Sequence, residues 1–181
     1  PMRKRALIAA FLLLLPSLVL AAQPSEEDKL FAELKKADSV EAAKPIETKL
    51  NELFHASGSA SVDLLMTRAG MALGQADHGT ARKLVDAVTR VAPDYAEGWR
   101  LRARMQQASG DDTGAMVSLD RAIRANPRHF TAMAELAEMM EDYGDKAGAL
   151  KLYRRALALD PHLAAAAERA KALTKEIEGQ G

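Results

Sequence analysis

The 181-residue chain contains no cysteine and few aromatic residues, with one Trp, three Tyr and four Phe. Without cysteine there can be no disulfide framework, thiolate metal site, cysteine nucleophile or thioether-linked lipid. The scarcity of aromatic side chains disfavours a β-sandwich or barrel, whose strands are rich in aromatic and β-branched residues. Basic and acidic residues are equal in number, at 25 each. That balance argues against a nucleic-acid-binding surface, which usually carries a basic surplus.

Sequence motifs for catalysis are also absent. The chain has no G-x-S-x-G, H-E-x-x-H, P-loop or G-x-G-x-x-G pattern. We therefore expect no enzymatic activity and no cofactor. The four histidines lack the spacing of metal ligands, so we expect no metal site. His129 and His162 fall in equivalent turns of the pattern described below, and we expect exposed turn residues there.

Residues 1–21 have the pattern of a secretory signal peptide. Three basic residues at positions 3–5 precede an apolar run over 6–15, and Val19 and Ala21 suit a cleavage site after Ala21. Cleavage would leave a mildly acidic protein with no membrane span, in the periplasm if the source is a Gram-negative bacterium. The alternative is an uncleaved anchor. The 17 residues of 6–22 are shorter than the ~20 that a spanning helix needs.

An internal period of 34 residues organises the rest of the chain. Eight columns of similar residues recur in three copies. They include a proline column and an aspartate column, which an alanine-rich composition cannot explain. Two alanine columns and a methionine column accompany them. These five columns are Pro93, Pro127, Pro161; Asp77, Asp111, Asp145; Ala69, Ala103, Ala137; Ala81, Ala115, Ala149; and Met71, Met105, Met139.

Each copy predicts a hairpin of two helices. In 130–163, apolar residues recur at helical spacing before and after Gly144-Asp145. Glycine can leave the first helix in a left-handed conformation, and aspartate can cap the second. The alanines suit close approach of two helices, and we expect the three methionines to fill gaps between helices. The predicted helices are 26–37, 40–56, 62–74, 79–91, 96–109, 112–125, 130–143, 146–159 and 163–177.

These columns resemble the tetratricopeptide repeat family, in its exported bacterial form. The middle copy shows the pattern best, with Trp99, Ala103, Gly110-Asp111, Ala115 and Pro127, although Arg102 departs from the usual leucine and Ala76 from the turn glycine of the first copy. The resemblance implies an all-α, right-handed α-solenoid with a C-terminal capping helix. It divides the chain into a degenerate hairpin (22–61), repeats 62–95, 96–129 and 130–163, and a capping helix with its tail (164–181).

The resemblance also implies that the first helix of each repeat lines a concave groove. The residues it places there, as candidates for peptide binding, are Arg100, Arg104, Glu97, Gln107, Glu135 and Glu138. Arg100 and Arg104 lie one turn apart, and as an unpaired couple they would grip a carboxylate. The alternative is a solvated face with pairs between repeats, such as Arg104 with Glu138.

The function predicted from these features is a non-catalytic scaffold of the cell envelope. It would bind a peptide or helix of an unidentified partner protein in the groove, and we expect no nucleic-acid partner. Two alternatives stay open. One is a self-associating structural protein that forms a homo-oligomer, and the other is a membrane-anchored assembly factor.

Overall fold

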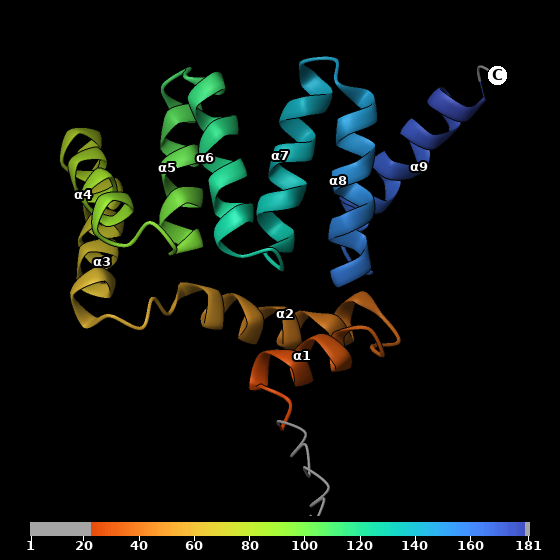
Figure 1. Ribbon diagram of the computed structural model, residues 1–181, viewed down its shortest axis with the longest axis horizontal. Coiled ribbons are helices and arrows are strands. Elements are labelled where there is room, and N and C mark those ends of the chain that lie inside the picture. The colour runs from red at the N-terminus through yellow and green to blue at the C-terminus, as the bar shows by residue number, and fades with distance from the viewer. Residues whose placement is uncertain (1–22, 180–181) are drawn as a thin grey trace, which may run out of the picture.

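The computed structural model describes residues 23–179, and over that range the chain is entirely helical (Figure 1). The signal-peptide prediction falls on residues outside this range. No helix in the described range is long and apolar enough to cross a membrane. The helices are α1 (Glu26–Leu34), α2 (Val40–His55), α3 (Ala60–Gly74), α4 (His78–Val91), α5 (Ala96–Ala108), α6 (Asp112–Ala125), α7 (Phe130–Asp142), α8 (Lys146–Leu159) and α9 (Ala164–Glu178).

The aspartate column defines where the second helix of each repeat begins. Asp77, Asp111 and Asp145 are the N-caps of α4, α6 and α8, and each carboxylate accepts a backbone N–H three residues later. Such a cap satisfies one of the N–H groups that the first helical turn leaves without an intrahelical partner. The turns before these caps use a left-handed residue, Gly110 at φ 80° and Gly144 at φ 86°. The capping and turn predictions are therefore confirmed.

The alanine columns form the contacts within each helix pair. On the first helices, Ala69, Ala103 and Ala137 are at most 2% exposed, and their counterparts Ala81, Ala115 and Ala149 on the second helices are fully buried. Because alanine carries only a methyl group, the two helix backbones can approach closely at these positions. The pairs α3–α4, α5–α6 and α7–α8 stack side by side, and α9 packs on α8 (Figure 1). The predicted all-α solenoid is confirmed.

The N-terminal hairpin lies across the stack. Helix α2 runs beneath the ends of the repeat helices, with α1 beside it (Figure 1). Its rings Phe31 and Phe54 pack against Phe130, at the start of α7. The Tyr95 hydroxyl donates to the backbone oxygen of His55 at 2.7 Å. The hairpin thus covers the turns that join successive repeats.

Helix α2 begins before Pro45. Ser39 caps it through a bond from the Ala42 N–H, and Pro45 lies inside the helix near its first turns. The predicted start of this helix at residue 40 is confirmed.

The prediction for the methionine column holds for one copy and fails for another. Met139 is 4% exposed and belongs to the core, whereas Met71 is 60% exposed. No repeat precedes α3, and the hairpin that comes before it in the chain lies across the ends of the repeat helices instead (Figure 1). Met71 therefore fills no gap between helices.

Candidate functional site

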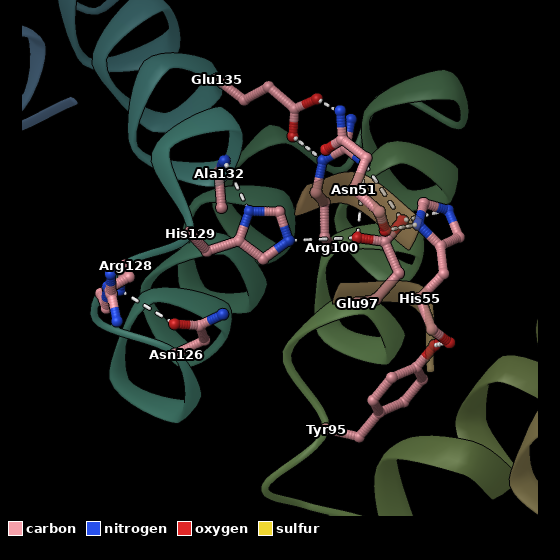
Figure 2. Close-up of polar contacts among 10 residues, drawn as sticks. All are labelled: Asn51, His55, Tyr95, Glu97, Arg100, Asn126, Arg128, His129, Ala132 and Glu135. Carbon is pink, nitrogen blue, oxygen red and sulfur yellow. Dashed lines mark hydrogen bonds and ion pairs between the residues drawn. The ribbon is translucent and has the colours of Figure 1, made fainter. Parts of the chain in front are cut away.

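Arg100 on α5 bridges two successive repeats. Its Nε and Nη2 donate to the two carboxylate oxygens of Glu135 on α7, at 2.9 Å and 2.6 Å, and its Nη1 donates to Glu97 at 3.1 Å (Figure 2). This is the planar, two-bonded arrangement that guanidinium and carboxylate groups prefer. The expectation that Arg100 is unpaired is wrong. The pairing between repeats that formed the alternative does occur, but between Arg100 and Glu135.

Glu97 lies at the centre of a buried polar cluster. Its side chain is 6% exposed, and one carboxylate oxygen accepts a hydrogen bond from His129 Nε2 at 3.1 Å (Figure 2). His55 Nε2 lies 3.4 Å from the other oxygen. Burial alone would raise the pKa of Glu97. The hydrogen bond from His129 and the nearby Arg100 and His55 outweigh it, and the pKa lies below its usual value. The carboxylate therefore stays ionised inside the protein.

His129 does two jobs in this cluster. Its Nδ1 accepts the Ala132 backbone N–H at 3.4 Å, which caps α7, so Nε2 carries the proton that is donated to Glu97 (Figure 2). The ring is 1% exposed because Phe54 packs against it, with 4.8 Å between ring centroids. The expectation of an exposed turn residue is therefore wrong for His129, and the cause is the hairpin that covers the turn. His162 is half-buried and contacts the backbone oxygen of Leu34.

Arg104, one turn beyond Arg100, has a different environment. It is exposed and lies at a cavity of about 530 Å³ between α3, α4 and α5. Two further cationic or titratable groups, Arg82 and His78, stand at the same cavity. Within residues 23–179 no carboxylate pairs with Arg104, so the suggested pair with Glu138 is not formed. The walls of the cavity are apolar and consist of Leu73, Leu101, Met105 and Ala108.

A second cavity, of about 460 Å³, lies between α7 and α9. Glu135 and Glu138 line it, and Gln107 lines neither cavity. The groove positions of the third repeat also include Glu141 and Asp142 on α7. The sequence did not point to Glu168 and Arg169, because α9 was expected only as a cap. The charged residues of this second cavity are Glu135, Glu138, Glu141, Asp142, Glu168 and Arg169.

The described residues contain no group of three or more His, Asp or Glu side chains that could hold a metal ion. His129 and His162 have separate partners, Glu97 and Leu34. What the two cavities offer is surface for recognition: apolar walls with charged groups at their rims. A preformed apolar concavity with a few placed charges is the usual form of a binding site.

Comparison with known proteins agrees with the architecture. The chain is 30% identical over 92 residues to a TPR repeat-containing protein of Rhizobium etli, and the match covers 51% of this chain and 45% of that one. It therefore spans less than half the length of this curated relative. No family model matches the chain.

Solved structures show the same fold. The Yersinia enterocolitica type III secretion chaperone SycD, in complex with a peptide of the translocator YopD, superposes with a TM-score of 0.59 at 15% identity, covering 65% of this chain and 95% of that one. This chain has the fold of a tetratricopeptide repeat array. The first TPR of Spaghetti, bound to an HSP90 peptide, gives a TM-score of 0.58 at 15% identity, covering 65% of this chain and 93% of that one.

Proposed function

We propose that this repeat array is a non-catalytic scaffold that binds a peptide or helix of a partner protein along its first helices, α3, α5 and α7. The observation that carries the proposal is the pair of cavities on these helices. Leu101, Arg104 and Ala108 line one, and their counterparts 34 residues later, Glu135, Glu138 and Asp142, line the other. The same helix positions therefore form both cavities. Two neighbours of the same fold were solved with peptides bound, which supports this use of the fold.

A cavity-filling variant tests the proposal. Ala134→Trp places a bulky ring in the α7–α9 cavity, which Ala134 lines. We expect it to abolish capture of the partner from an envelope extract by the immobilised chain of residues 23–181. The matched control is Val117→Trp, since Val117 is 55% exposed on α6 and lines neither cavity. Equal capture by the two variants would place the interaction surface elsewhere.

Arg100 and Arg104 call for separate single variants. Arg100→Ala would leave Glu97 and Glu135 without their shared partner, and loss of one member of a buried pair costs roughly 3 kcal/mol of stability. Arg104 has no such structural role. We therefore expect Arg104→Ala to weaken partner binding with no change in thermal stability, whereas Arg100→Ala should lower stability.

The location of the scaffold is a proposal from the sequence. We place it in the cell envelope, exported by cleavage after residue 21, because positions 1–21 have the order of a signal peptide. The mass of the intact protein purified from its native host tests this. A chain that starts near residue 22 agrees with export, and a chain that retains 1–21 agrees with an anchor.

Self-association is a second candidate function, favoured by the outer face of α3. Leu64 and Met71 are 50% and 60% exposed there. Of their counterparts one repeat later, Gly98 packs against the preceding repeat and Met105 is half-buried. A second copy could cover this face. Sedimentation equilibrium of the wild type and of Leu64→Glu/Met71→Glu would show an oligomer that the variant loses. A wild-type monomer at all concentrations would exclude it.

A further inference from the structure

The two cavities of the proposed groove are opposite in charge. Arg82 and Arg104 stand at the α3–α5 cavity, whose lining includes no carboxylate. Five carboxylates and one arginine line the α7–α9 cavity. The same columns of the repeat produce this change of sign, because Arg104 is replaced by Glu138 one repeat later and Ala108 by Asp142. The groove therefore has a basic end and an acidic end.

The charges at each end are available to a partner. Arg169 and Glu141 pair with each other across the acidic cavity, and Glu135 is bound to Arg100. Three carboxylates are left over, and no ion pair within residues 23–179 involves them: Glu138, Asp142 and Glu168. At the basic end, Arg82 donates to the Ser109 hydroxyl, and Arg104 has no ionic partner in the same range. A charge that is already paired would attract a partner only weakly, whereas Arg104 and these three carboxylates are not paired within the described residues.

Apolar surface accompanies each charged rim, so each end suits a side chain rather than a free ion. Leu73, Leu101 and Met105 line the basic cavity. Ala134, Tyr153 and Ala165 line the acidic one. A partner side chain that is apolar near its backbone and charged nearby can bury methylene groups against such walls while its charge meets the rim.

We infer that the groove selects a partner segment with charges of both signs, an acidic and apolar part for the α3–α5 cavity and a Lys- or Arg-containing part for the α7–α9 cavity. This inference rests on the proposed function, since it names the chemistry of the partner that the groove binds. The cavities lie about two helix spacings apart, roughly 20 Å. An extended peptide covers that distance with about six residues. Electrostatic complementarity of this kind fixes orientation and excludes partners of a single sign.

The test uses labelled peptides of about ten residues and fluorescence polarisation at low salt. Two mixed-charge peptides carry Glu-Leu-Asp and Arg-Leu-Lys at opposite ends of a Gly-Ser spacer, one in each chain direction. Comparison peptides carry the acidic sequence at both ends, the basic sequence at both ends, or neither. We expect the peptide of mixed charge to bind at least about tenfold more tightly than any comparison peptide. The preference should shrink as salt is added.

Charge reversals locate the two ends. Arg104→Glu should weaken binding of the mixed-charge peptide about tenfold and strengthen binding of the all-basic peptide. Glu138→Arg should also weaken binding of the mixed-charge peptide about tenfold, and it should strengthen binding of the all-acidic peptide. Both residues are exposed, so the variants should fold, as circular dichroism can verify. Arg90→Glu on the exposed side of α4 is the control and should change nothing. If all peptides bind alike, or the reversals leave the preference unchanged, the inference is wrong while peptide binding stands. If no peptide binds, both proposals are wrong.

Discussion

His129, the N-cap of α7, and Glu97 on α5 meet through Nε2 and Oε2 at 3.1 Å, and both side chains are almost fully buried. Because the same imidazole also caps α7 through Nδ1, one ring joins a helix start, a neighbouring repeat and the N-terminal hairpin that covers it. The His129–Glu97 contact therefore lies where α5, α7 and the N-terminal hairpin meet.

Removal of this ring should be costly. We expect His129→Ala to lower the free energy of unfolding by about 3 kcal/mol, since Glu97 loses a buried donor and α7 loses its cap. His55 also contacts Glu97 but its side chain is 59% exposed, so His55→Ala should cost less than about 1 kcal/mol. Urea unfolding of the two variants compares them directly. Similar losses would mean that burial of the contact is unimportant.

Asp160 should limit stability at neutral pH. Its Oδ1 accepts the His162 N–H, but its buried Oδ2 has no hydrogen-bond partner within the described residues, and burial raises the pKa of this carboxyl above its usual value. A carboxyl with a raised pKa favours the fold while protonated, and that contribution is lost as the pH rises through the folded-state pKa. Asn126, one repeat earlier, makes the same turn with a neutral amide.

We therefore expect Asp160→Asn to stabilise the protein by about 1 kcal/mol at pH 7. The gain should vanish near pH 3, where the carboxyl is protonated in both states. Glu47 gives a second readout, since burial and, after it, the charge of Asp160 raise the pKa of its carboxyl, and the variant removes the charge of Asp160. Unfolding curves across this pH range measure the difference, and a gain that does not depend on pH would contradict the charge argument.

Ala76 holds the left-handed turn position of the first repeat, at φ 58°, where the other repeats have Gly110 and Gly144. An alanine pays a steric cost of about 1 kcal/mol in this conformation. Ala76→Gly should therefore raise stability by roughly 0.5–1 kcal/mol. Gly144→Ala is the reverse experiment and should lower stability, because alanine is strained at the φ of 86° found there. The added methyl group would meet no heavy atom within 4 Å, so only the backbone conformation contributes to the loss. Thermal unfolding of both variants measures the two effects.

The close contacts between helices should not tolerate enlargement. Ala137→Leu forces three extra carbon atoms into a position with no exposed surface, and we expect it to cost about 1–3 kcal/mol. Ala165 on α9 is exposed, so Ala165→Leu should cost little. Equal losses in thermal unfolding would contradict the assignment of faces.

Contacts within each helix pair could be predicted from the sequence, and contacts with the hairpin could not. The aspartate and alanine columns specify caps and close approach within one unit, so the period alone gives the helices and their pairing. The burial of His129 depends on Phe54, about 75 residues earlier in the chain, and no period of 34 relates the two. The period also could not predict the exposure of Met71, because the hairpin that precedes α3 does not follow the repeat.

The candidate site divides in the same way. The columns placed Arg104 and Glu138, which are opposite in charge, at the same helix position of successive repeats, and each lines a cavity, because position within a repeat determines which side of a helix a residue occupies. They could not show that Arg100 is already bound, since its partner Glu135 is 35 positions away, one residue off the period. Side-chain reach between helices decides that contact.

The position of the hairpin has a consequence for folding kinetics. A linear array makes contacts only between neighbours and can lose its units one at a time from the ends. Here the Arg128 side chain binds Asp28 across 100 positions, and the His162 side chain reaches Leu34 across 128. Contacts so distant along the chain close late and slow the overall rate, because the loop entropy is lost before they form. Once closed, they make opening of the last repeat depend on the first residues of the fold, so the array should unfold as one unit.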